Sequence, residues 1–180
     1  MKRIILTLTF LLATSSVASA QFTPSKDNLR GLTGVRLIVM FDRPTRAEAF
    51  DEVKRPGVLK MLEDDTKAKL EKAGIPFSRS QFADEIGKDY GRLIVLAKLD
   101  MPNGFETEVK LLQRVRLARD PSIEFDAVTW SLAGVGNKLE IPTVRSQIAD
   151  LIDRFIEDYL SVNPKQSASS RKDKSRDTKH

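Results

Sequence analysis

The strongest constraint on the fold is a strand pattern that gives way to a helix pattern in the second half of the chain. Residues 105–117 alternate between apolar and polar side chains, which is the period of a half-buried antiparallel strand. Residues 144–159 instead carry apolar side chains three and four positions apart, as an amphipathic helix does. A sheet with one apolar face and a helix with one apolar stripe can bury both against each other. The sequence therefore predicts helix packed on one face of a sheet.

The remaining segments complete this plan. Residues 35–41 and 92–101 predict strands, the second of them buried on both faces. Residues 57–73 have helical spacing and stop at a glycine followed by an apolar residue and a proline. A short edge strand is expected within 75–81, and a last strand at 123–132 switches apolar parity partway, as a β-bulge would cause. We expect an α+β two-layer sandwich: a mainly antiparallel four- to five-stranded sheet with two helices on one face, in the order β-α-(β)-β-β-β-α.

The amino terminus predicts a cleavable export signal over residues 1–20. Two basic residues precede an apolar run of about ten residues, which is too short for a membrane helix of ~20. Small residues at Ala18 and Ala20 fit signal-peptidase cleavage before Gln21. An uncleaved anchor is the alternative interpretation. We expect an exported protein, periplasmic or secreted, with no transmembrane segment in the mature chain.

Charge separates the ends of the chain from its body. The net charge of +5 arises as +2 from residues 1–20, −1 from residues 21–164 and +4 from residues 165–180. A lead-in segment (21–34), a single domain (35–163) and a basic disordered tail (164–180) are therefore expected. The body has no basic field for specific nucleic-acid binding. The tail is a solubilising terminus or contacts anionic envelope polymers weakly.

Common catalytic and metal-binding residues are missing. The chain has no cysteine, so it lacks a lipidation site and disulfides, and its one histidine is the terminal His180. Ser-His-Asp and Cys-His catalysis and the usual zinc and copper sites are therefore excluded. The acidic run at 63–65 lies beside lysines on a predicted helix surface and is a solvated face. Gly134 and Gly136 lack the remainder of a phosphate-binding loop. We predict no enzyme, no cofactor and no metal; a hydrolase using carboxylates alone is a remote alternative.

The candidate binding site is the sheet face that the two helices leave open. Apolar side chains on that face would form a patch of the kind that marks interaction surfaces, and tryptophan is frequent at such sites. The predicted site residues are Ile38, Met40, Ile94, Leu96, Leu112, Val128 and Trp130. The alternative is that the chain covers this face with its own loops. The loop residues Phe50, Phe77 and Phe82 would then pack there.

Three sequence stretches carry a resemblance. They are Leu-Glu-Lys-Ala-Gly-Ile-Pro at 70–76, Thr-Trp-Ser at 129–131 and Phe-Ile-Glu-Asp-Tyr-Leu-Ser-Val-Asn-Pro at 155–164. Between residues 29 and 164 the chain resembles a group of small secreted bacterial proteins of unknown function, which implies no activity. The element order is similar to periplasmic envelope-assembly domains such as the lipopolysaccharide-assembly lipoprotein and the amino-terminal domain of the Tol-Pal translocation protein. The missing lipidation cysteine is a departure from the lipoprotein.

Two functions fit these observations. The first is a non-catalytic cell-envelope protein that binds a protein partner, or a second copy of itself, through the open sheet face or an edge strand. The second is a binder or carrier of a small apolar ligand held between sheet and loops, with Trp130 as a wall. The sequence leaves both open.

Overall fold

The computed structural model describes residues 25–42, 57–78, 90–98 and 104–164. The predicted export signal with its Ala20–Gln21 cleavage point and the tail from 165 onward lie outside these residues. Phe50 and Phe82 lie outside them as well. Within the described part of the chain, neither helix combines the length and the apolar character that crossing a membrane requires.

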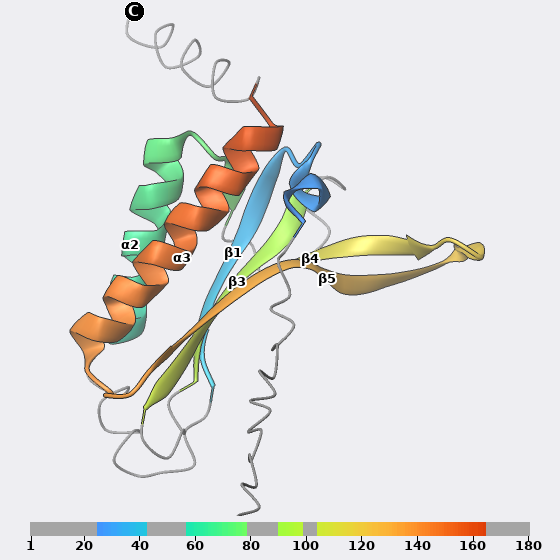
Figure 1. Ribbon diagram of the computed structural model, residues 1–180. Helices are drawn as coiled ribbons and strands as arrows, with labels where there is room; N and C mark the ends of the chain where they lie inside the picture. Colours follow the sequence, from blue (N-terminus) through green and yellow to red (C-terminus); the bar gives the residue numbers. More distant parts are fainter. Residues whose placement is uncertain (1–24, 43–56, 79–89, 99–103, 165–180) are drawn as a thin grey trace, which may run out of the picture.

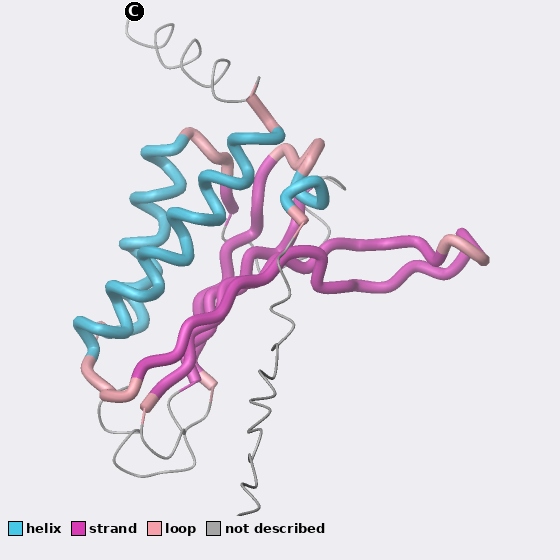
Figure 2. The backbone as a smooth tube through the Cα atoms, viewed as in Figure 1, coloured by secondary structure: helices cyan, strands magenta, loops and turns pink. Residues whose placement is uncertain are grey.

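The described residues form a five-stranded sheet in the order β2-β1-β3-β4-β5 with two α-helices on one face (Figures 1 and 2). β1 runs parallel to β2 and β3, whereas the longer β3-β4-β5 part is antiparallel. The expected α+β sandwich and its element order are confirmed. The elements are η1 (Lys26–Leu29), β1 (Gly34–Phe41), α2 (Val58–Ala73), β2 (Phe77–Ser78), β3 (Tyr90–Lys98), β4 (Phe105–Leu117), β5 (Asp120–Gly136) and α3 (Ile141–Val162).

The end of α2 follows the predicted glycine signal. Gly74 has a φ of 72°, a left-handed conformation in which a residue with a Cβ atom would be strained. Its N–H donates to the Glu71 carbonyl, and the Ile75 N–H donates to the Leu70 carbonyl at 3.0 Å. Ile75 is buried, so the chain turns off the helix with an apolar contact in place.

α3 packs on the part of the β4–β5 hairpin that lies within the body of the sheet (Figure 1). Phe155 meets the ring of Trp130 edge-on at 5.2 Å between centroids. Near the start of the helix, the Gln147 side chain accepts from the Thr107 hydroxyl at 2.7 Å and donates to the Val135 carbonyl at 3.1 Å. Gly134 lies beneath this amide, and a Cβ there would come within 2.6 Å of it. The buried residues of α3 are Val144, Ile148, Leu151, Ile152, Phe155 and Tyr159.

The lead-in segment contributes to the core as well. Leu29 is fully buried and Leu32 nearly so. At the end of α3, the Asn163 amide donates to the Leu29 carbonyl at 2.8 Å, and its oxygen accepts from the Gly31 N–H at 2.8 Å. The Tyr159 hydroxyl donates to the Leu32 carbonyl at 2.8 Å. This network joins the segment before β1 to the last turn of α3.

Candidate interaction surface

Six of the seven predicted site residues lie on the sheet face opposite the helices, here called the open face. The register pairs Ile38 with Ile94 and Met40 with Leu96. These residues alternate with the core positions Val35, Leu37, Leu93 and Val95, so they point away from the helices. Leu112 and Val128 are also paired, farther along the sheet. Their exposure differs: Leu96 is buried, whereas Met40 is 42% and Val128 50% exposed.

Trp130 is not on the open face, and its predicted placement there is wrong. It is fully buried against α3, where its indole N–H donates to Asp158 at 3.0 Å. The cause is the position of the bulge. Trp130 pairs with Leu111 while Val128 pairs with Leu112, so Thr129 is the extra residue and its two neighbours point to opposite faces. The predicted bulge is confirmed, but it lies on the other side of Val128 from the expected position.

The open face is also not a continuous apolar patch. Lys98 of β3 contacts Glu106 at 2.8 Å and Glu108 at 3.8 Å, and Lys110 contacts Glu108 at 3.1 Å. The hydrogen bond with Glu106 raises the pKa of Lys98. In the register, Lys110 and Glu108 of β4 lie opposite Ile94 and Leu96, and Arg92 of β3 lies opposite Leu112. A polar band on β4 therefore borders the apolar side chains of β3, and the predicted patch is interrupted by charged residues.

Of the three phenylalanines expected to pack on the open face if the chain covers it with its own loops, the structure places one. Phe77 lies in β2 and pairs with Val35 of β1. It is half-buried and packs against the core on the helix side of the sheet. It therefore does not cover the open face. Phe50 and Phe82 lie outside the described residues.

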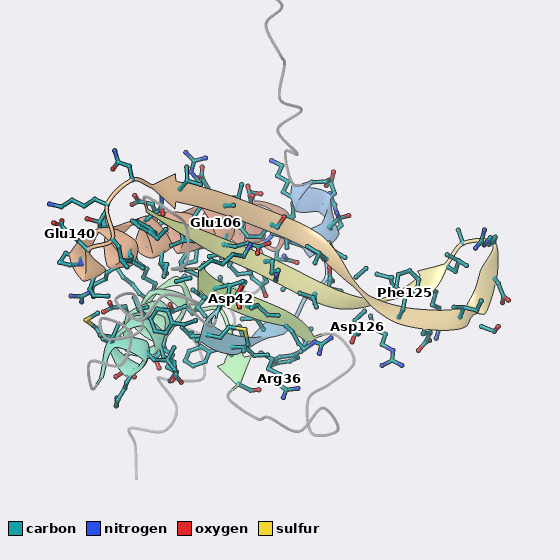
Figure 3. The ribbon with its side chains drawn as sticks, turned by 90° about the horizontal axis from the view of Figure 1, so that it is seen from below. Arg36, Asp42, Glu106, Phe125, Asp126 and Glu140 are labelled. Carbon is teal, nitrogen blue, oxygen red and sulfur yellow. The ribbon has the colours of Figure 1, made fainter. Side chains whose placement is uncertain are left out.

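The β4–β5 hairpin extends beyond the rest of the sheet (Figure 1). The pairing of β4 with β3 ends at Leu112, and from there β4 pairs with β5 alone among the described strands. Residues 113–127 of this extension are called the arm. Figure 3 shows Phe125 and Asp126 on the arm, well away from both helices, and Glu106 within the body of the sheet. The arm is thus a two-stranded ribbon that the helical layer does not reach.

One face of the arm is apolar and exposed. Val115 pairs with Phe125, so both side chains point to the same side of the ribbon. Leu117 and Ile123 each lie two residues from this pair along their own strands, at a second register shift where Leu117 pairs with Asp120. Phe125 is 45% and Ile123 47% exposed, and both belong to the group of large apolar residues that the described structure exposes. Four members of that group lie on β5: Ile123, Phe125, Val128 and Val135.

The opposite face of the arm is held by ion pairs. Glu124 accepts from Arg116 at 2.8 Å and lies 3.5 Å from Arg114, which lowers the pKa of its carboxyl group mainly through the Arg116 hydrogen bond. At the base, Asp126 pairs with Arg92 of β3. These cross-strand pairs stabilise the ribbon geometry without covering its apolar face.

The bulge at the base of the arm is fixed by side chains. Thr129 donates its hydroxyl to Gln113 on β4, and its carbonyl accepts from the Asn28 amide of η1 at 2.7 Å. The outward-facing edge of β5 is therefore covered by η1 at this one point. β-Bulges increase strand twist, and this bulge lies where the arm leaves the body.

The sequence reasoning missed the arm because alternation alone does not show whether a face is covered. A signal was available in the element lengths. The strand predicted at 105–117 is longer than its expected neighbours, and strands of unequal length leave an overhang. β4 spans 13 residues and β5 17, whereas β1 spans 8 and β3 9.

A groove between the two helices is the second candidate site. It has a volume of about 580 Å³ and is lined by residues of α2 and α3. The Arg145 guanidinium spans the two helices and donates two hydrogen bonds to Asp65, at 2.5 and 2.8 Å. The lining residues are Met61, Asp65, Ala68, Lys69, Ile141, Pro142, Arg145, Ser146 and Ala149.

The acidic residues of the run on α2 form ion pairs with basic side chains. Glu63 pairs with Lys67, Asp64 with Lys60, and Asp65 with Arg145 of α3. Across the described residues, no three carboxylate, histidine or cysteine side chains are grouped as a metal site requires. The run therefore stabilises the helix and its packing on α3.

No family model matches the chain, and neither a curated protein nor a solved structure is significantly similar to it.

Proposed function

We propose that this chain is an exported, non-catalytic cell-envelope protein that acts as a protein-interaction module, with the arm as its docking element. The observation that carries the proposal is the exposed apolar face of the arm, which contains Phe125 and Ile123. Export is supported by the signal-like residues 1–20, and the envelope by the resemblance to assembly domains.

The physical basis is the unburied area of these side chains. Complete burial of a phenylalanine or isoleucine side chain is worth ~1.5–3 kcal/mol. About half of each side chain remains in water here, so a partner that covers both would gain roughly 1–3 kcal/mol. Aromatic and large aliphatic anchors of this kind dominate binding energy at interfaces.

The placement of charge on the arm also favours docking through its apolar face. Its ion pairs lie on the far side from the apolar face and can stay in water when that face is covered. The open face of the sheet is less suited, because a partner would have to cover its charged band.

Site-specific photocrosslinking in the producing cells tests this proposal. A benzophenone amino acid is placed at Phe125 and, as a matched control, at Leu59 on α2, which is 42% exposed against 45%. We expect a light-dependent protein adduct from position 125 and none from position 59. Adducts from position 59 alone, or from neither position, would contradict docking through the arm.

The helix groove favours the ligand-binding alternative. Its volume lies within the ~300–1,000 Å³ typical of small-molecule sites, and several of its lining side chains are apolar. Ala149→Trp would fill it, whereas Ala118→Trp at the arm turn would not. If the alternative holds, an apolar fluorescent dye binds the protein and is excluded by Ala149→Trp only. Equal dye binding by both variants would rule out the groove as its site.

A further inference from the structure

We infer that the outer edge of β5 between Trp130 and Gly136 binds an extended peptide segment of a partner protein, which adds a strand to the sheet. These residues are called the binding edge. They lie in the body of the sheet, where β5 pairs with β4 on one side and no described strand follows on the other. The inference is independent of the apolar face of the arm and gives the chain a second interaction surface.

Two carbonyls show how the backbone is oriented along the binding edge. The Gly136 carbonyl faces β4, because a Cβ atom placed on Gly104, at the start of that strand, would lie 1.8 Å from its oxygen. The Val135 carbonyl points the other way and accepts from the side-chain amide of Gln147 at 3.1 Å. Neighbouring residues of β5 therefore face opposite sides here, as in a regular antiparallel strand.

Two residues in the middle of the binding edge present outward backbone groups. β5 pairs with β4 without a register shift from 130 to 136, so Ser131 and Ala133 direct their N–H and carbonyl groups to the same side as Val135. Within the described chain, no hydrogen bond reaches these groups of Ser131 and Ala133. They are peptide donors and acceptors at the spacing of a strand, and the ligand that matches them is another extended backbone.

Side-chain amides already bind carbonyls at both ends of this segment. Asn28 of η1 donates to the Thr129 carbonyl at 2.7 Å, and Gln147 of α3 donates to the Val135 carbonyl at 3.1 Å. Each bond joins an amide N–H to a carbonyl on the outer side of β5, which is the kind of bond that a partner strand makes. Between these two points the described chain leaves the edge open over about five residues, a common strand length.

The binding edge also lacks the features that hinder pairing farther along the same strand. In the arm, β5 carries three acidic residues and a proline: Asp120, Pro121, Glu124 and Asp126. Charge and proline both protect an exposed edge against strand addition. The binding edge reads Trp-Ser-Leu-Ala-Gly-Val-Gly and has neither. β5 therefore hinders pairing along the arm and permits it on the body.

The position of η1 disfavours a second copy as the occupant. In an antiparallel pair of two binding edges about a two-fold axis, hydrogen bonds to Ser131 and Ala133 place Thr129 opposite a residue between 133 and 137 of the other copy. That residue would meet Asn28, which is bonded to the Thr129 carbonyl. A short segment of another protein avoids this clash because it can end or turn away beside Ser131. Its side chains on the open face would lie beside Ala133 and the 70% exposed Val135, so we expect them to be uncharged.

A synthetic strand tests the inference. The probe is the pentapeptide acetyl-Thr-Val-Thr-Val-Thr-amide, added to the isotope-labelled chain beginning at Gln21 while its amide signals are followed by nuclear magnetic resonance. We expect saturable binding in the millimolar range, because main-chain recognition does not require a particular side-chain motif. The amide protons of Ser131 and Ala133 should move downfield, as they do when a strand hydrogen bond forms.

Two controls remove backbone donors, one on each side of the pair. The same peptide with every peptide nitrogen methylated cannot donate and should bind at least about tenfold more weakly. Ala133→Pro removes an outward N–H where a sheet edge tolerates proline, and should weaken binding similarly. Ala133→Ser keeps the N–H and should bind like the wild type. Circular dichroism checks that both variants are folded.

Three results would overturn the inference. They are unchanged amide signals from 130 to 136 at millimolar peptide, equal binding of the methylated peptide, and signal changes centred on the arm. The last two would mean that the peptide binds through its side chains or at another place. None of these results bears on docking through the arm, which is measured by crosslinking from position 125.

Discussion

The base and the arm of the β4–β5 hairpin have the same sequence pattern and opposite surroundings. At the base, Leu111 and Trp130 are cross-strand partners, and both are fully buried under α3. In the arm, Val115 and Phe125 are cross-strand partners on the same side of the ribbon, yet Phe125 is 45% exposed. The difference is the helix, which covers one part of the hairpin and does not reach the other. An apolar face is core where a second layer meets it and stays exposed where none does.

The largest expected effect comes from truncating one aromatic residue in each region. Trp130→Ala should lower the free energy of unfolding by about 3–5 kcal/mol, because it leaves a cavity beside Phe155 and removes the partner of Asp158. Phe125→Ala should change it by less than ~1 kcal/mol, because its ring is half in water. Urea denaturation of both variants measures the contrast. Similar losses in the two would mean that the arm is part of the core.

The second effect concerns the attachment of η1, which covers the edge of β5 at Thr129. Asn163 bonds the carbonyl of Leu29 and the N–H of Gly31, and so ties η1 to the end of α3. Asn163→Ala should cost about 2–3 kcal/mol, since a buried carbonyl loses its donor. Amide hydrogen exchange should then rise in η1 and the last turn of α3. An equal rise in the arm would show that the two regions unfold together.

Most of the fold could be predicted from the sequence because its signals are local. Alternation over 105–117, helical spacing over 144–159 and the glycine at 74 each depend on neighbours in the chain, and each corresponds to an observed element. The candidate site depended instead on how the strands pair, which is not a local property. The face of Trp130 is set by the register of Thr129 against β4, and a shift of one residue exchanges the faces.

The polar band of the open face shows the same limit. The sequence shows that Lys98, Glu106 and Lys110 are charged. Which of them lie side by side depends on the register between β3 and β4, which the sequence pattern does not give. The arm itself depends on where β3 stops, because only that point separates a covered strand from an extending one.

A third effect, of roughly 2–3 kcal/mol, should appear at alkaline pH in the body alone. Burial raises the pKa of Tyr159 to about 12. The folded state therefore holds this proton more tightly than the unfolded state, so the associated stability is present below pH ~10 and is lost as the pH rises towards 12. Ultraviolet titration should show one of the two tyrosines ionising late, and Tyr159→Phe should remove that phase. A single phase near pH 10 in the wild type would mean that water reaches Tyr159.

The smallest effect lies in the arm and concerns Glu124. Arg116 and Arg114 lower the pKa of this exposed carboxyl group, so its contribution to stability is present above the unfolded pKa and is lost as the pH falls through the lowered one. Arg116→Ala should move the pKa back towards the ordinary glutamate range, as read from the carboxyl chemical shift during a pH titration. The urea midpoint should stay where it is, because exposed ion pairs contribute little to folding. Arg119→Ala at the turn is the control and should leave the pKa of Glu124 unchanged. If Arg116→Ala instead shifts the unfolding transition as Trp130→Ala does, the ion pairs of the arm support the body, and the separation between the two halves of the hairpin does not hold.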